Sequence, residues 1–113
     1  MAEHFYHSES PKNLRKLRQL KPDLFASFID FDKKVFEPGA LDLKTKELIA
    51  VAAAHTTQCA FCIDAHTKRA QKAGASEAEI SEAIFVAMAL GAGAPFAHSA
   101  IAMGALEEKK PQS

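Results

Sequence analysis

The chain has 113 residues, 48% of them hydrophobic, and carries 14 basic and 14 acidic side chains. This length favours one domain with a small core, and the formal net charge of zero argues against nucleic acid or an anionic membrane surface as a partner. No basic start leads into an apolar run of membrane-spanning length, so we expect no membrane span and a cytoplasmic location.

The residue pattern is helical throughout. The sequence has 22 alanines but only 13 valine, isoleucine and threonine residues, with no run of strict polar and apolar alternation. We therefore predict an all-α fold, a compact single-domain bundle of about five to six helices over residues 11–106. Residues 1–10 are predicted to be a flexible arm, in which His4 and His7 are solvated, and residues 107–113 a polar tail.

Five of the eight phenylalanines lie in the chain up to Phe36, counting Phe5. Ser10 can cap a short helix with Pro11 in its first position, and this helix has a basic face that we expect to be solvated. A second helix is predicted over 23–36 from its dense apolar face. The sequence 37–39, Glu-Pro-Gly, ends it, because proline disfavours a helical conformation in the residue before it.

The later helices are marked by caps and breaks. Asp42 is a plausible cap for a helix over 43–55, followed by an interruption at 56–58 and a helix from Cys59 to about Ala73, which Gly74 closes. Ser76 and Glu79 form a capping box for a helix through about Leu90. The small residues 91–94 then predict a break, and Pro95 starts a last helix to about Leu106.

The stretch 47–66, ELIAVAAAHTTQCAFCIDAH, contains both cysteines of the chain. Random placement of two cysteines would give the C-x-x-C spacing in only about 2% of cases. In the cytoplasm such a pair is more often catalytic or metal-binding than structural, and a bridge this short constrains little of the unfolded chain. The spacing therefore indicates chemistry rather than a structural crosslink.

A helix would place Cys59, Cys62 and His66 on one stripe, because residues at i, i+3 and i+7 share a face. The helix N-terminus at Cys59 favours its thiolate form. Glu47 lies one helix earlier, and a helical hairpin at 56–58 could return its carboxylate to the stripe.

A zinc site is the main alternative to thiol redox chemistry, since two thiolates and the imidazole of His66 are good ligands and Glu47 or His55 could be a fourth. Ligands on one helical stripe converge poorly on a tetrahedral ion, so we favour redox chemistry and expect no metal. His55 is expected to bond the last carbonyls of its helix rather than join a proton relay. His98 is expected to be a packed or interface histidine.

The order Glu47, eleven residues, Cys59-Ala60-Phe61-Cys62, three residues, His66 resembles the E-x11-C-x-x-C-x-x-x-H signature of the AhpD-like alkylhydroperoxidases, within the carboxymuconolactone decarboxylase superfamily. The resemblance covers about residues 41–106. It implies an all-α homo-oligomer, commonly a trimer or hexamer, that reduces organic hydroperoxides or hydrogen peroxide without a bound cofactor. It also implies a dithiol reductant, either a lipoyl-bearing or a thioredoxin-like protein.

The resemblance assigns roles to the four residues. Cys62 is the peroxidatic thiol, Cys59 the resolving thiol, and Glu47 and His66 the proton relay. Helix position alone favours Cys59 as the more acidic thiol, and the two views agree if His66 activates Cys62 while Cys59 stays available for exchange.

One position departs from the pattern, since characterised hydroperoxidases carry a histidine between the cysteines where this chain has Phe61. The decarboxylase branch lacks the cysteine pair, which argues against that activity. Two alternatives stay open: a general disulfide reductase, and a non-catalytic oligomeric binding protein on the same scaffold that could hold zinc.

Overall fold

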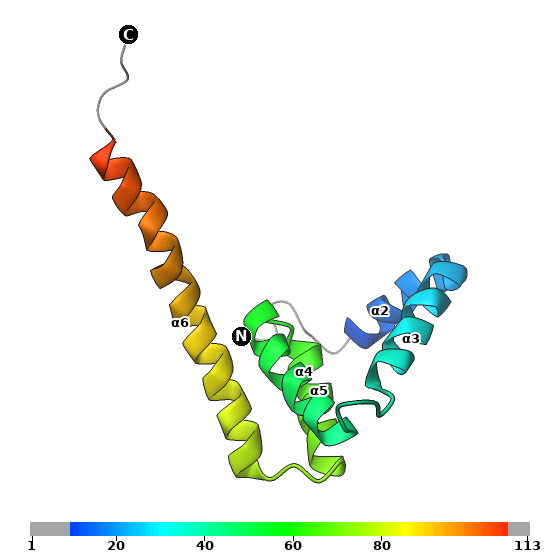
Figure 1. Ribbon diagram of the computed structural model, residues 1–113. Helices are drawn as coiled ribbons and strands as arrows, with labels where there is room; N and C mark the ends of the chain where they lie inside the picture. Colours follow the sequence, from blue (N-terminus) through cyan, green and yellow to red (C-terminus); the bar gives the residue numbers. More distant parts are fainter. Residues whose placement is uncertain (1–9, 109–113) are drawn as a thin grey trace. The chain divides into compact units, whose positions relative to one another are not determined.

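The computed structural model describes residues 10–108, and this part of the chain contains five α-helices and no strand (Figure 1). The predicted all-α fold is confirmed. Most of the predicted arm and tail, including His4 and His7, lies outside the described residues. The helices are α2 (Ser10–Leu20), α3 (Pro22–Phe36), α4 (Leu43–Thr57), α5 (Ala60–Lys72) and α6 (Glu77–Glu107).

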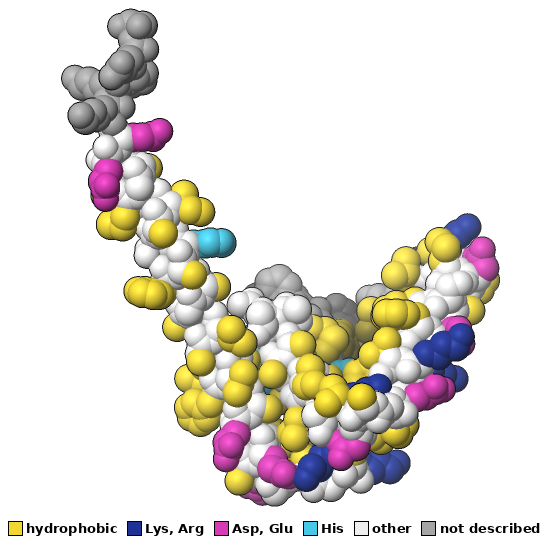
Figure 2. Space-filling model, viewed as in Figure 1, with side chains coloured by type: hydrophobic (Ala, Val, Ile, Leu, Met, Phe, Trp, Pro, Cys, Tyr) yellow, Lys and Arg dark blue, Asp and Glu magenta, His cyan; other side chains and the backbone are white. Residues whose placement is uncertain are grey.

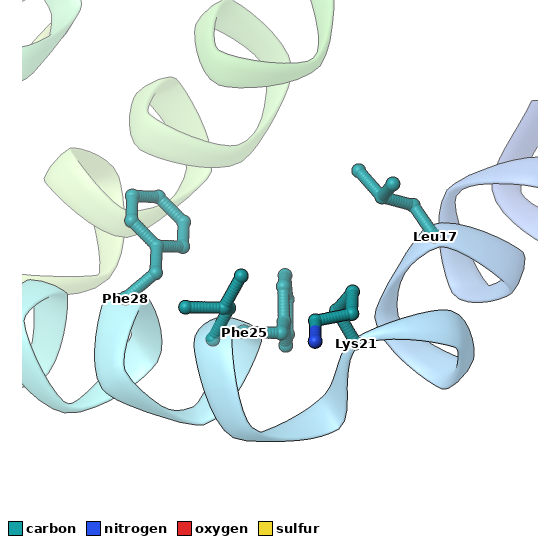
Figure 3. A pocket seen from close by; sticks show the side chains of 5 residues that line it. Leu17, Lys21, Phe25 and Phe28 are labelled. Carbon is teal, nitrogen blue, oxygen red and sulfur yellow. The ribbon is translucent and has the colours of Figure 1, made fainter.

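The chain divides into two compact units, one ending at Glu37 and the other beginning at Pro38. In the first unit, α2 and α3 enclose an apolar groove of about 380 Å³ (Figure 3). The Arg18 guanidinium lies 5.7 Å from the ring centroid of Phe25, within cation–π range. The groove is lined by Leu17, Lys21, Leu24, Phe25 and Phe28.

The second unit contains the cysteine stretch, and in it α4 packs against both α5 and α6. Helices α4 and α5 lie side by side in Figure 1. Small side chains let these helices approach closely, since the buried core contains two alanines beside one valine and one isoleucine. The core cluster is Val51, Ala70, Ala75 and Ile80, with Leu48 and Ile84 packed against it.

Three predicted helix boundaries of this unit are confirmed. The Asp42 carboxylate accepts from the Thr45 amide at 2.8 Å, which caps α4. Ser76 and Glu79 form the predicted capping box at the start of α6. Gly74 leaves α5 with a φ of 101°, a conformation that glycine adopts without a steric penalty.

One predicted break is wrong, and another is shorter than expected. The break at 91–94 does not exist, because α6 runs unbroken for 31 residues with Pro95 inside it. Proline removes one amide donor there, but the neighbouring residues 91–94 have almost no side-chain bulk and accept helical geometry. The helix therefore continues, and the number of helices in residues 10–108 is five.

The interruption predicted at 56–58 is shorter than expected, since α4 extends through Thr57. Both threonines bond back to the helix: the Thr56 hydroxyl donates to the carbonyl of Ala52 at 3.3 Å, and that of Thr57 to Ala54 at 3.4 Å. This back-bonding is compatible with helix. Only Gln58 and Cys59 separate α4 from α5.

The second half of α6 is exposed and apolar, as the hydrophobic side chains along it in Figure 2 show. Among the described residues, α6 is long and apolar enough to cross a membrane by length and composition alone, and 6% of its most apolar stretch is buried in the chain. The expectation that no apolar run reaches membrane-spanning length is wrong, because the predicted break at 91–94 divided α6 into two shorter helices.

Candidate active site

The two cysteines form a disulfide at the start of α5. Cys59 is the N-cap residue, and its sulfur accepts a hydrogen bond from the amide of Cys62 at 3.3 Å. The two Cα atoms lie 5.2 Å apart, and both residues are partly accessible. The pair is thus in the oxidised form, at the helix end where backbone amides stabilise a thiolate once the bond is reduced.

The backbone immediately before the disulfide is unusual. Gln58 has a φ of 58° and a ψ of 45°, the left-handed region that non-glycine residues rarely adopt. The amides of Gln58 and Cys59 both donate to the carbonyl of Ala54, which closes α4 and turns the chain into α5. This turn places Cys59 at the N-terminus of α5.

The turn also brings Glu47 of α4 against His66 of α5. Oε1 of Glu47 lies 2.6 Å from Nδ1 of His66, across a sequence separation of 19 residues. The Glu47 side chain is 4% exposed and that of His66 15%. An ionised carboxylate can only accept, so with Glu47 ionised Nδ1 carries the proton and Nε2 is the nitrogen for exchange with other groups.

His66 follows Cys62 by four residues within α5, so both lie on the same helical face. The structure therefore brings the four predicted site residues together in two pairs. The disulfide joins Cys59 to Cys62, and a hydrogen bond joins Glu47 to His66. One helical turn separates the pairs along α5.

Three other singled-out residues lie as follows. Nδ1 of His55 donates to the carbonyl of Val51 at 2.7 Å, which lies one turn before the last carbonyls of α4 that it was expected to bond. His98 is exposed on α6, so it is not packed within its own chain. Phe61, between the cysteines, is 37% exposed.

Within the described residues, no group of three or more histidine, cysteine, aspartate or glutamate side chains is placed to hold a metal ion. The disulfide engages the two sulfurs, and Glu47 engages Nδ1 of His66. In this part of the chain the two sulfurs and Nδ1 of His66 thus make contacts with protein groups.

The sequence did not predict a groove that the structure shows. It lies between the end of α4 and the middle of α6, and Gln58 lines it. Nothing in the sequence predicts that Gln58 adopts a left-handed backbone conformation. A signal was present on α6, where Ile84, Ala87, Met88 and Gly91 follow i, i+3, i+4, i+7 spacing, but the predicted break at 91–94 obscured it.

Comparison with known proteins places this site in a family. The sequence profile of the carboxymuconolactone decarboxylase family matches residues 22–105. The chain belongs to the carboxymuconolactone decarboxylase family. Uncharacterized protein 4 of the cox locus of Paracoccus denitrificans is 50% identical over 82 residues, which cover 73% of this chain and 74% of that one.

Solved structures of the carboxymuconolactone decarboxylase family have the same fold. A family protein from Legionella pneumophila is 34% identical and has a TM-score of 0.68, covering 93% of this chain and 96% of its own. Another from Thermotoga maritima is 38% identical with a TM-score of 0.58, covering 74% and 86%. The family includes AhpD-like and decarboxylase members, and this chain has the C-x-x-C pair.

Proposed function

We propose that this protein is a thiol-dependent hydroperoxide reductase with an antioxidant role. The observation that carries the proposal is the pairing of a C-x-x-C disulfide with a buried carboxylate and imidazole one helical turn away. A redox-active dithiol needs a nearby group that takes and returns protons, and an imidazole held by a carboxylate is suited to that task.

In the first step, the Cys62 thiolate attacks the terminal oxygen of the hydroperoxide. An S–O bond forms, the O–O bond breaks, and Cys62 becomes a sulfenic acid while the peroxide is reduced by two electrons. The departing alkoxide takes a proton from Nε2 of His66 and leaves as an alcohol. Glu47 stabilises the imidazolium before this transfer, since its carboxylate lies 2.6 Å from Nδ1.

In the second step, Cys59 resolves the sulfenic acid. Cys59 loses its proton to the relay, and its thiolate attacks the sulfur of Cys62; the S–S bond forms, the S–O bond breaks, and the hydroxide takes up a proton and leaves as water. The amide hydrogen bond to the Cys59 sulfur supports its thiolate form. A Cys59 thiolate is the form that attacks the sulfenic acid.

In the third step, an external dithiol reopens the disulfide. One of its sulfurs attacks Cys59, the Cys62 thiolate leaves, and the second sulfur of the reductant displaces Cys59 to leave an oxidised reductant. A lipoyl-bearing or thioredoxin-like protein of the cytoplasm has the required chemistry. Partial accessibility of Cys59 supports this attack.

The relatives support an oxidative-stress role. Involvement in an antioxidative response has been suggested for the family protein from Thermotoga maritima, which is 38% identical to this chain. The decarboxylase reaction of other family members does not use a cysteine pair, and here that pair forms the disulfide.

We further propose that the protein functions as a homo-oligomer, a trimer or hexamer. Large apolar side chains on the second half of α6 are exposed in the single chain: Phe96 is 80%, Ile101 72% and Leu106 77% accessible. Exposed apolar surface of this kind marks an interface. Light scattering without detergent should give a multiple of the 12.2 kDa chain mass; a monomer, or protein that requires detergent, would contradict the oligomer.

The direct test of function is hydroperoxide consumption by the reduced protein with a dithiol reductant in excess. Wild type should turn over, and Cys62→Ser should lose activity to the uncatalysed rate. Equal consumption by the two proteins would rule the proposal out. Reduction of a protein disulfide without peroxide, measured in parallel, separates a hydroperoxide reductase from a general disulfide reductase.

A further inference from the structure

Helix α6 packs on the core of its own chain with its first three turns only. Ile80, Ile84 and Ala87, at i, i+4 and i+7, form the face that contacts the core. Every residue from 88 to 107 is exposed, which is about 30 Å of helix at 1.5 Å per residue. The second half of α6 therefore extends beyond the core of the single chain, as Figure 2 shows.

The surface that this helix leaves exposed is apolar and uncharged. No aspartate, glutamate, lysine or arginine lies between Glu82 and Glu107 in the sequence. An apolar surface of this size marks an interaction site, and a molecule that covers it needs an apolar face without charges. The large side chains on it are 54% to 80% exposed: Phe85, Val86, Leu90, Phe96, Ile101 and Met103.

The middle of this surface allows a second helix to approach closely, because its side chains are small. Gly93, Ala97, Ala100 and Gly104 lie at i, i+4, i+7 and i+11, on the side of α6 turned roughly 140° from the core-facing residues. A Cβ added at either glycine meets no atom within 4 Å. The distance between two packed helices depends on the side chains at their contact, so these positions permit a short one.

The residues of this surface are arranged symmetrically along the helix. Gly93 and Gly104 are equally far from the midpoint between residues 98 and 99, and so are Ala97 and Ala100. In an antiparallel pair of identical helices centred there, Gly93 lies level with Gly104 of the second copy and Ala97 with Ala100. The surface is therefore complementary to a copy of itself after a two-fold rotation, as an isologous interface requires.

Electrostatics favours the antiparallel direction. A parallel pair places two helix C-termini side by side, each with the negative end of its dipole and a Glu107 carboxylate. In the antiparallel pair the two Glu107 residues are about 26 Å apart along the axis, well beyond the screening length of about 8 Å at physiological ionic strength.

We propose that α6 of one copy packs antiparallel against α6 of a second copy, about a two-fold axis that passes between residues 98 and 99. The proposal rests on the homo-oligomer proposed above and is independent of the peroxide chemistry. A trimer with three-fold symmetry contains no two-fold axis, whereas a hexamer built from two trimers contains it. The pairing of α6 therefore selects the hexamer.

A cysteine crosslink tests both the direction and the register of the pair. The native cysteines are closed in their disulfide, so an added cysteine supplies the free thiol of the oxidised protein. Tagged Gly93→Cys is co-expressed with untagged Gly104→Cys, oxidised with copper phenanthroline and run on a non-reducing gel. We expect a disulfide between tagged and untagged chains, because facing glycines bring the two Cα atoms into disulfide range.

Each variant alone is the matched control for this crosslink. Two copies of residue 93 lie about 17 Å apart along the axis of the antiparallel pair, so Gly93→Cys alone should form no dimer, and neither should Gly104→Cys. Crosslinks in the single variants without a mixed one would show a parallel pair. Absence of any crosslink would also overturn the proposed pairing.

The oligomeric mass gives a second measurement. Ala97→Glu places carboxylates inside the pair, where burial penalises them, and light scattering without detergent should show half the wild-type mass. Ala102→Glu, exposed and about 140° away around α6, should keep the wild-type mass. An unchanged mass in Ala97→Glu, or an equal loss in both variants, would overturn the α6 pairing.

Three further readings separate the possible failures. A wild-type monomer overturns the oligomer and the pairing together, and a wild-type oligomer without the mixed crosslink overturns the pairing alone. Sedimentation of wild type with phosphatidylcholine vesicles would show that lipid covers α6, which also overturns the pairing. Hydroperoxide consumption by the same wild-type sample tests the reductase function separately, because the α6 pair contains none of the four redox-site residues.

Discussion

The Glu47 carboxylate and the His66 imidazole are in contact at 2.6 Å, although the two residues belong to different helices. Both are largely buried, and the contact fixes the orientation of the His66 ring next to the cysteine pair on α5. A hydrogen-bonded carboxylate of this kind selects the imidazole tautomer. Helix α4 therefore contributes to the site by holding the Glu47 carboxylate against His66 of α5.

Substitution of Glu47 should separate proton transfer from folding. Glu47→Gln retains an acceptor for Nδ1 but removes the charge, so we expect kcat/KM with a hydroperoxide to fall about 100-fold with an unfolding free energy lower by only about 1 kcal/mol. His66→Ala leaves a buried carboxylate without this partner and should cost about 3 kcal/mol. Glu82→Gln, on the exposed side of α6, is the matched control and should change neither. Full activity in Glu47→Gln would exclude the relay.

Phe61 occupies the position at which characterised hydroperoxidases of this family carry a histidine. Its side chain is 37% exposed, so a polar replacement removes little core packing. Phe61→His should raise kcat/KM with a hydroperoxide about tenfold, because it adds a proton donor between the two sulfurs. Phe85→His, at a 63% exposed position of α6, should leave the rate constant unchanged. A decrease in Phe61→His would show that the apolar ring itself serves the reaction.

The left-handed backbone conformation of Gln58 should lower the free energy of unfolding. A residue with a Cβ pays about 1–2 kcal/mol in this region and glycine pays none, although glycine loses more entropy on folding. We expect Gln58→Gly to raise the unfolding free energy of the oxidised protein by about 0.5–1 kcal/mol. Gln71→Gly, the same change within α5, should lower it by up to about 1 kcal/mol. Urea denaturation measures both, and a loss of stability at position 58 would contradict the strain.

The cap of α6 predicts a pH dependence. The backbone amide of Ser76, followed by the Lys44 ammonium at 2.9 Å, lowers the pKa of Glu79 below its usual 4.5. Because the folded-state pKa is below the unfolded one, the carboxylate stabilises the fold above about pH 4.5, and this contribution disappears as the pH falls through the folded-state value. Urea unfolding from roughly pH 6 to 3 should show a smaller stability loss in Glu79→Gln than in Glu82→Gln. Equal pH profiles would contradict this assignment.

The parts of the fold that follow from local chemistry could be predicted from the sequence. Asp42 and the Ser76–Glu79 box mark helix starts because their side chains bond nearby amides. The break at 91–94 was wrong because proline and glycine only weaken a helix locally, and α6 continues through them. Composition cannot show whether the flanking segments compensate for one missing hydrogen bond.

In the candidate site, too, the sequence predicts what depends on local spacing and not what depends on tertiary packing. Residues close in sequence, Cys59, Cys62 and His66, could be placed on one helix from their spacing. The approach of Glu47 was a possibility that depended on the angle between two helices, and this angle is set by the conformation of Gln58. The groove between α4 and α6 arises from tertiary packing, and the predicted break at 91–94 obscured the apolar spacing on α6 that lines it.

The central claim is that Cys62 attacks the peroxide and Cys59 resolves. It is tested most directly by adding one equivalent of cumene hydroperoxide to reduced Cys59→Ser and to reduced Cys62→Ser in the presence of dimedone, followed by peptide mass spectrometry. Cys59→Ser should consume the peroxide in a single turnover and carry the sulfenic acid adduct on Cys62, while Cys62→Ser should consume none above the uncatalysed rate. An adduct on Cys59 in Cys62→Ser, with no adduct on Cys62 in Cys59→Ser, would contradict the account.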